Sequence, residues 1–340
     1  MISLVVPIYN EEEIVNLLHN SIASAMGHVD ESWEVVYIDD GSKDSSLQLL
    51  RELQAADPRI VVVSLSRNWG HMGALDAGLK TAQGDAIVLM DGDLQDPPDV
   101  IPELVTAWKG GAQVVLAVRR SRQESRKYLA FLFPIFYRLL GAMSDYPIPL
   151  NAGIFGLLDR QALDSLNGLQ EGNRYLPGLR AWVGYRTAVV YYDRNDRVGG
   201  IGKLTFLSRI KYAMDAITSF SYKPLRFSFA LSAVSILTAV LLGVAALLSH
   251  SLINPIGYGI AASVFLVGGL LMFCGGILGE YIGRIYDEVR GRPLSIVNEV
   301  YRADTAYLAG EETDASHAGQ VQIVGPNGNS TKLKRTVPAA

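Results

Sequence analysis

Short hydrophobic runs alternate with amphipathic stretches through the first 120 residues of the chain. Five hydrophobic runs are typical of strands: 3–8, 34–38, 60–64, 86–90 and 113–118. Four stretches between them have helical spacing: 11–26, 45–56, 72–82 and 99–108. Strands that alternate with helices in this way predict an α/β fold with a doubly wound, mostly parallel sheet.

Polar residues follow three of these predicted strands. The segments are PIYNEE after the first, DDGS after the second and DGDLQD after the fourth. Ligands bind beyond the carboxyl ends of the strands in such sheets, so we expect a binding crevice at this edge.

The segment DGDLQD contains two carboxylates, Asp91 and Asp93, separated by one glycine. Two such carboxylates can share a hard divalent cation, and Mg²⁺ often combines few protein carboxylates with substrate phosphates. The alternative is a solvated acidic turn. In the same way, Asp39 or Asp40 can accept hydrogen bonds from a nucleobase or ribose, or can form turn and helix-cap contacts.

No Asp, Glu, Lys or Arg occurs between residues 227 and 279. Within this region, segments 227–248 and 260–282 are each long enough to span a bilayer, which takes about 20 residues. Lys223 and Arg226 precede the first segment and Arg284 follows the second, so the positive-inside rule places both termini in the cytoplasm. Buried core helices are the alternative.

Two flanking stretches combine cations with apolar residues, which suits helices that lie on a membrane surface. They are the basic cluster at 119–127 with the aromatic run after it, and residues 204–221. A buried helix is the alternative reading of the first. A glycine stripe at Gly275, Gly279 and Gly283 suits close helix contact within a hairpin or between subunits of a homo-oligomer.

The bulk composition narrows the choice of partners and compartment. The net charge of −4 gives no reason to expect a nucleic-acid partner, and the single cysteine excludes a disulfide within the chain. The N-terminal segment MISLVVPIYN is typical of a first strand rather than a signal peptide, so we expect a cytoplasmic N-terminal domain.

Five segments taken together resemble the family 2 glycosyltransferases. They are VVPIYNEEE, YIDDGSKDSS, LSRNWGHMGALDAGL, GDAIVLMDGDLQDPP and GEYIGRIYDEVRGRPLSIV. Within that family, they are most similar to the polyprenyl-phosphate branch, which includes bactoprenol glucosyltransferases and dolichyl-phosphate mannose synthases. The resemblance extends in order to about residue 297.

The resemblance implies a GT-A fold that binds a nucleotide sugar and a divalent cation, Mg²⁺ or Mn²⁺. It assigns the cation and the donor phosphates to Asp91, Asp93 and Gln95. It assigns the donor's nucleoside to Pro7, Tyr9, Glu11, Asp39 and Asp40. Asn10 and Arg67, which stand in the same segments, are further candidates for contact with the donor. His71, in the same segment as Arg67, is expected to be structural.

The resemblance also implies a set of cations that meet the donor diphosphate and the lipid phosphate: Arg119, Arg126, Arg197 and Lys203. Two positions depart from the family pattern. Ile154 stands where many relatives have Asp in G-D-F-R, and Gly202 replaces the serine of the basic loop. Hence no general base is assigned, and Asp159 reads equally well as a helix cap. The implied acceptor is a phosphate monoester with a second pKa of about 6, which needs positioning cations more than a base.

We therefore expect four regions: a GT-A domain at 1–203, interfacial helices at 204–226, two transmembrane helices at 227–286, and a largely flexible extension at 287–340. The expected reaction is inverting transfer of one sugar, best matched by UDP-glucose, to polyprenyl phosphate at the cytoplasmic face of the plasma membrane. The alternatives are a processive or hydroxyl-acceptor glycosyltransferase, a nucleotidyltransferase acting on a phospholipid, and a non-catalytic nucleotide-binding scaffold.

Overall fold

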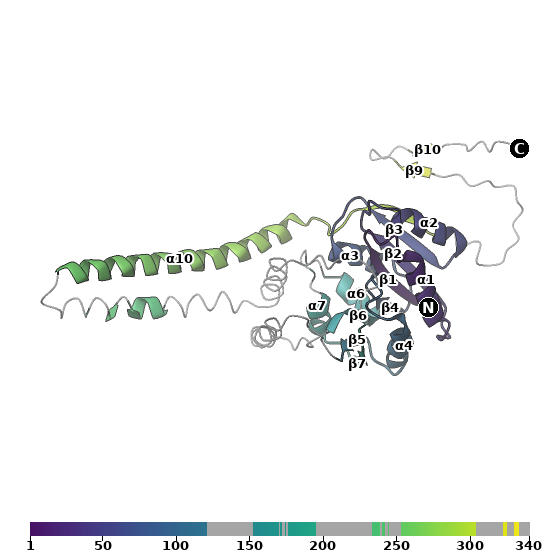
Figure 1. Cartoon of the computed structure of the whole chain (residues 1–340), viewed down its shortest axis with the longest axis horizontal. Coiled ribbons are helices and arrows are strands. Elements are labelled where there is room, and N and C mark those ends of the chain that lie inside the picture. The colour runs from purple at the N-terminus through teal and green to yellow at the C-terminus, as the bar shows by residue number, and fades with distance from the viewer. Residues whose placement is uncertain are drawn as a thin grey trace, which may run out of the picture. The chain divides into compact units, whose positions relative to one another are not determined.

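The computed structural model describes residues 1–120, 152–169, 171, 174, 176–194, 233–238, 240–241, 244, 253–303, 322–324 and 330–332 (Figure 1). The chain divides into two units, Met1–Arg302 and Ala303–Ala340. The second unit contains one antiparallel pair, β9 (Gln322–Val324) and β10 (Ser330–Lys332). The first unit contains all the other described elements.

An eight-stranded mixed sheet forms the centre of the first unit, in the order β7-β5-β6-β4-β1-β2-β3-β8. Its strands are β1 (Ile2–Ile8), β2 (Trp33–Asp39), β3 (Ile60–Leu65), β4 (Ala86–Leu89), β5 (Val114–Arg119), β6 (Ala152–Asp159), β7 (Thr187–Tyr192) and β8 (Val297–Tyr301). The pairs β1–β2, β2–β3, β1–β4 and β5–β7 are parallel. The strands β6 and β8 run antiparallel to their neighbours.

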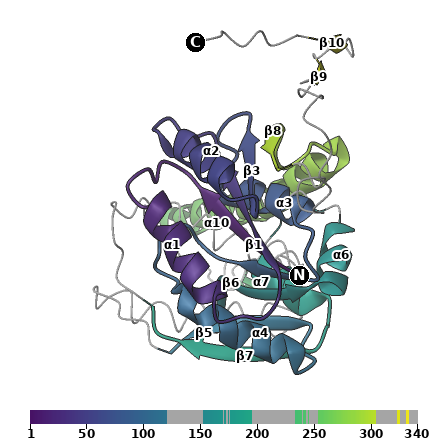
Figure 2. The same ribbon diagram turned by 90° about the vertical axis from the view of Figure 1, so that its right-hand side faces the viewer.

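Helices cover both faces of this sheet (Figure 2). They are α1 (Val15–Met26), α2 (Ser46–Ala56), α3 (His71–Thr81), the 3₁₀ turn η1 (Pro98–Val100), α4 (Ile101–Lys109), α6 (Arg160–Asn167) and α7 (Leu176–Trp182). The first unit also contains the long helix α10 (Ile253–Arg290). Successive strand residues point to opposite faces. Val35 and Tyr37 of β2 therefore face the core beneath α1, α2 and α4, whereas Val36 and Ile38 face the core beneath α3, α6 and α7.

The predicted α/β class, the mostly parallel sheet, and the five strands and four helices of the first 120 residues are confirmed. The first helix begins at Val15, later than the predicted residue 11. The loop before it is fastened to the loop after β2, because the backbone N–H groups of Glu11 and Glu12 donate to Ser46 Oγ and Asp44 Oδ2. These side-chain acceptors hold residues 10–12 outside the helix.

Strand β8 was not predicted, because its sequence VNEVY lacks a continuous hydrophobic run. It is the outermost strand of the sheet and is mostly exposed on both faces. Its strand conformation therefore depends on pairing with β3 rather than on a hydrophobic pattern. It pairs antiparallel with β3, with Val297 opposite Leu65 and Tyr301 opposite Val62. Residues 297–301, which sequence analysis assigns to the C-terminal extension, thus belong to the sheet.

Among the described residues, one segment is long and apolar enough to cross a membrane: Leu266–Arg290 within α10, with a mean hydropathy of 1.6. None of its apolar window is buried in the fold. It overlaps the second predicted span, 260–282. Most of the first predicted span, 227–248, lies outside the described residues.

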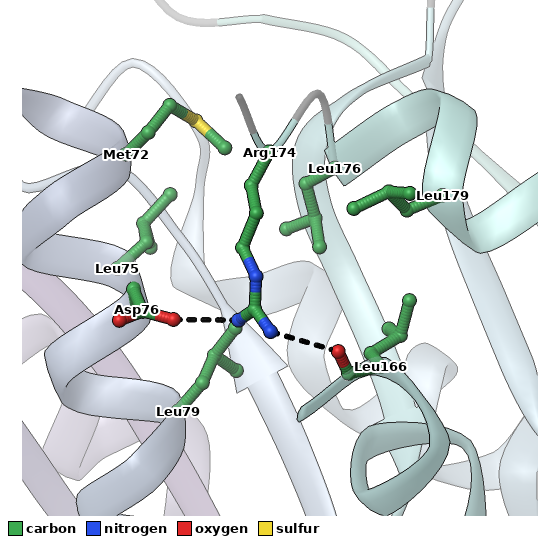
Figure 3. Close-up of a pocket in the computed structure, with 8 residues that line it drawn as sticks. All are labelled: Met72, Leu75, Asp76, Leu79, Leu166, Arg174, Leu176 and Leu179. Carbon is green, nitrogen blue, oxygen red and sulfur yellow. Dashed lines mark hydrogen bonds and ion pairs between the residues drawn. The ribbon is translucent and has the colours of Figure 1, made fainter. Parts of the chain in front are cut away.

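A buried ion pair fastens α3 to the segment between α6 and α7 (Figure 3). Arg174 Nη1 donates to Asp76 Oδ1 at 2.5 Å, and Arg174 Nη2 donates to the carbonyls of Leu166 and Leu169. Both side chains are buried among leucines that line a small pocket. Lys80, which is more than half exposed, binds the other oxygen of Asp76 at 2.7 Å.

Substitution of Asp76 by Asn should lower the free energy of unfolding by about 3–5 kcal/mol, since it leaves the Arg174 charge buried without its anion. Thermal unfolding of the full chain in detergent measures this loss. The control Lys80→Met removes only the exposed partner and should cost at most about 1 kcal/mol. Equal stability of the two variants would contradict the assignment.

Candidate functional site

Strand ends that carry the predicted site residues meet at one edge of the sheet. The strands β1, β2, β3 and β4 are parallel to one another, so their carboxyl ends share this edge. Antiparallel pairing of β6 with both β4 and β5 brings the start of β6 and the ends of β5 and β7 to the same edge. This edge therefore collects the loops at residues 9–11, 39–42 and 91–96 beside Arg119 and Arg194.

Side-chain hydrogen bonds join the loops after β1 and β2. The N–H of Asn10 donates to Ser42 Oγ at 3.0 Å, and Asn10 Oδ1 accepts from the N–H of Lys43 at 2.8 Å. Asn10 has a φ of 53°, a conformation that asparagine tolerates better than most residues. Tyr9 and Glu11 lie half-buried on the same loop, and half-buried Pro7 lies near the end of β1. The residues predicted to bind the nucleoside are thus brought together, with Asn10 acting as a brace.

The structure separates the roles of Asp39 and Asp40. Asp39 is 1% exposed and its Oδ1 accepts from the N–H of Ser42 at 3.2 Å. Asp40 uses both oxygens on the loop after β3, accepting from the N–H groups of Trp69 at 2.7 Å and Gly70 at 3.0 Å. Asp40 therefore holds that loop, whereas Asp39 is the better candidate for ligand contact.

Close backbone approach explains why glycine follows Asp40. A Cβ on Gly41 would lie 2.6 Å from the carbonyl carbon of Arg67, and the φ of Gly41 is 67°. The same approach brings the exposed Arg67 to the site edge, where its guanidinium stacks on the Trp69 ring with 3.7 Å to the ring centroid.

The loop after β4 is tightly folded against β1. A Cβ on Gly92 would lie 2.7 Å from the carbonyl oxygen of Pro7, so only glycine fits between Asp91 and Asp93. Leu94 has a φ of 56°, and the N–H of Gln95 donates to Asp93 Oδ1 at 3.2 Å. A residue with a positive φ and a buried side chain indicates that tertiary contacts hold this turn.

Asp91 and Asp93 fit a divalent cation. Asp91 Oδ1 is a buried oxygen without a hydrogen-bond donor. Within the described part of the chain, no three His, Cys, Asp or Glu side chains form a complete cage. Mg²⁺ sites commonly combine one or two carboxylates with substrate phosphates and waters, so the pair suits a cation that arrives with a diphosphate.

Asp96 joins the acidic loop to the cationic side of the site. It is 1% exposed, and its Oδ1 accepts from the hydroxyl of Tyr192 at 2.6 Å. Arg119 Nε donates to the same hydroxyl oxygen at 3.0 Å, and Arg119 Nη2 lies 3.6 Å from Asp96 Oδ1. No local sequence pattern predicts this network, because its members come from the loop after β4 and from β5 and β7.

Arg194 is a second cation beside Asp96, with its Nε 3.8 Å from Asp96 Oδ1. It was not predicted from the sequence, although it stands two residues after the end of β7, where polar residues near a strand end mark the site. Of the predicted cations, the structure places Arg119 in the site. Arg126, Arg197 and Lys203 lie outside the described residues.

Residue 154, where many relatives have Asp, is isoleucine and carries no carboxylate. The side chain of Ile154 packs against the hydrophobic core. Asp159 pairs with Ala86 at the opposite edge of the sheet, where it caps α6 by accepting from the N–H of Gln161 and also accepts from Trp108 Nε1. Asp159 is therefore a helix cap, remote from the site.

Burial raises the pKa of three carboxyls at the candidate site, those of Asp39, Asp40 and Asp96. For Asp39, hydrogen bonds from Ser42 oppose the effect on the pKa, and for Asp40 the N–H groups of Trp69 and Gly70 do so. For Asp96, the charge of Asp91 raises the pKa further, while Tyr192 and the nearby arginines lower it. All three groups pay a desolvation cost in their charged form.

The comparisons with known proteins agree on one class of enzyme. The family described as Glycosyl transferase family 2 matches residues 3–166. An uncharacterized glycosyltransferase of Bacillus subtilis, YkcC, is 40% identical over 90% of this chain and 96% of its own length. A prophage-derived bactoprenol glucosyl transferase of Shigella flexneri is 37% identical over 89% of this chain and 99% of its own length.

Solved structures match less closely. Glucosyl-3-phosphoglycerate synthase of Mycobacterium tuberculosis, in complex with Mn²⁺ and UDP-glucose, is 24% identical over 65% of this chain and 79% of its own, with a TM-score of 0.43.

Removal of the Tyr192 hydroxyl tests the network around Asp96. The substitution Tyr192→Phe leaves the buried carboxylate without its shortest hydrogen bond, and should lower the free energy of unfolding by about 1–3 kcal/mol. The adjacent Tyr191, which is 57% exposed, provides the control Tyr191→Phe, for which no loss is expected. Matching melting temperatures for the two variants would refute a structural role for the network.

The raised pKa of Asp39 predicts how Asp39→Asn changes stability with pH. The contribution of this carboxyl to stability is complete below its unfolded pKa of about 3.9, and is lost as the pH rises through the higher folded pKa. Asparagine does not titrate, so the melting temperature of the variant relative to wild type should rise across that window and then level off. A pH series of thermal unfolding measures this, with exposed Asp99→Asn as control. A difference that stays constant from pH 4 to pH 8 would contradict the prediction.

Proposed function

We propose that this chain, which belongs to glycosyl transferase family 2, transfers one sugar from a nucleotide sugar to a polyprenyl phosphate at a membrane surface. The observation that carries the proposal is the meeting of an acidic loop, Asp91 to Asp96, with Arg119 and Arg194 at one sheet edge. The names of its bactoprenol glucosyl transferase relatives support this acceptor and favour glucose.

The donor occupies the crevice above β1, β2 and β4 in this proposal. Asp39, the half-buried Tyr9 and Glu11 contact the nucleoside, and Arg67 lies at the rim. Asp91 and Asp93 hold a divalent cation, Mg²⁺ or Mn²⁺, with Gln95 beside them. When bound, the cation offsets the charge that builds on the leaving diphosphate.

The cationic side of the site holds the acceptor and the leaving group. Arg119 is kept in place by Tyr192 and Asp96, so it is already oriented for phosphate oxygens. Arg194 adds a second charge. A phosphate monoester, with a second pKa of about 6, is largely dianionic at neutral pH. It attacks the sugar without a general base, in agreement with Ile154 at the position of the family carboxylate.

The short segment between α10 and β8 connects the apolar helix to the candidate site. Strand β8 begins opposite the end of β3, at the site edge, and Ser66 N–H donates to the carbonyl of Ile296 at 3.0 Å. Only residues 291–296 separate that edge from the apolar helix α10. With α10 as one of two proposed transmembrane helices, a lipid phosphate is delivered near the crevice, and both termini lie in the cytoplasm.

Membranes that contain the full chain, incubated with radiolabelled UDP-glucose, undecaprenyl phosphate and Mg²⁺ or Mn²⁺, test the function. Label should enter the organic phase, and a chelator should abolish its transfer. The variant Asp93→Ala should transfer at least about 100-fold more slowly, as expected when an electrostatic contact to the transition state is lost. The control Asp99→Ala, at an exposed residue of η1 just after this loop, should retain activity.

Four outcomes would contradict parts of the proposal. Absence of organic-phase label with every UDP-sugar would overturn the proposal. Label in a water-soluble polymer would favour a processive enzyme, and release of pyrophosphate would favour a nucleotidyltransferase. Full activity of Asp93→Ala would remove Asp93 from the cation site.

A further inference from the structure

The imidazole of His71 faces the acidic loop from α3. Its Nε2 lies 3.4 Å from Asp91 Oδ1. The His71 side chain is 42% exposed and that of Asp91 is 31% exposed, so the pair lies near the surface, although Asp91 Oδ1 itself is buried. Sequence analysis took this histidine as structural, because neighbours in the chain do not reveal a partner twenty residues away.

The distance between these two atoms suits a shared ion better than a direct hydrogen bond. N–H···O bonds in proteins usually span about 2.7–3.2 Å, and Asp91 Oδ1 has no hydrogen-bond donor. In zinc sites, bonds to imidazole nitrogen and carboxylate oxygen are about 2.0–2.2 Å long, and Mg²⁺–oxygen bonds have a similar length. Two such ligand atoms lie about 3.0 Å apart at the octahedral angle and about 3.4 Å apart at the tetrahedral angle, so the observed 3.4 Å is at the upper end of this range.

The position of His71 is determined by contacts on both sides of it. Asp40 accepts from the N–H groups of Trp69 and Gly70, the two residues that precede His71. Gly73, in the first turn of α3, lies so close to the segment before β8 that an added Cβ would be 2.8 Å from the carbonyl oxygen of Leu294. Buried Asp40 thus positions the imidazole through the backbone.

We propose that His71 Nε2 is a protein ligand, together with Asp91, of the divalent cation that the reaction uses, and that Asp40 positions it. The inference rests on the proposed function for the presence of a cation. Imidazole is a better ligand for transition metals than for Mg²⁺, whereas carboxylates and water suit both Mg²⁺ and Mn²⁺. The site is therefore expected to prefer Mn²⁺ to Mg²⁺.

Electron paramagnetic resonance of Mn²⁺ added to the full chain in detergent with UDP tests this assignment. Bound Mn²⁺ in wild type should show the electron spin-echo modulation of a directly coordinated ¹⁴N. His71→Ala should lose that modulation and bind Mn²⁺ about 10- to 100-fold more weakly, with a smaller loss for Mg²⁺. The control His28→Ala replaces an exposed histidine two residues after the end of α1, and it should behave as wild type.

The spectroscopic signature separates ligation from a merely structural role, which would leave the modulation in any His71→Ala protein that still binds Mn²⁺. Wild-type protein without ¹⁴N modulation, or without Mn²⁺ binding, would overturn the inference, as would unchanged affinity in His71→Ala. The result is independent of the sugar-transfer assay: Mn²⁺ bound through His71 in a chain that transfers no sugar would reject the proposed function and retain the cation site.

Discussion

The two halves of the site depend on the buried carboxylate of Asp96. This one group binds the hydroxyl of Tyr192 and attracts Arg119 and Arg194, so it connects the loop after β4 with the ends of β5 and β7. A carboxylate that is 1% exposed requires such partners, because an unpaired buried charge is very costly. The same partners keep cations beside a loop that already holds Asp91 and Asp93. Charge balance at Asp96 therefore keeps Arg119 and Arg194 beside the acidic loop.

The edge also illustrates how a binding site is formed at the expense of stability. Burial raises the pKa of Asp39, Asp40 and Asp96, so each charged group opposes folding at neutral pH. Asp40 recovers part of this cost by accepting two backbone N–H groups, and in doing so positions the loop that carries Arg67 and His71. Such trade-offs are common where function requires buried polar groups.

Strand β8 connects the apolar helix α10 to the central sheet. It follows α10 in the chain and pairs with β3. Its first residue, Val297, lies opposite Leu65 at the end of β3, where the site loops begin. Further contacts fasten this strand: the Arg51 guanidinium stacks on the Tyr301 ring, and Arg302 Nη2 lies 3.5 Å from Glu34 Oε2. A strand held at both ends connects the apolar helix α10 to the sheet through the short segment 291–296.

The sequence alone determined the α/β class, the first five strands and the acidic loop, because hydrophobic periodicity and strand-end polar residues are local signals. Its motifs also indicated the family to which the chain belongs. Only the tertiary structure decided which of Asp39 and Asp40 braces a loop, that Asp159 is a cap on the far edge, and that Asp96 meets Tyr192. The pairing of His71 with Asp91 and the addition of β8 to the sheet were equally hidden. Each of these depends on contacts between residues far apart in the chain, which no local pattern encodes.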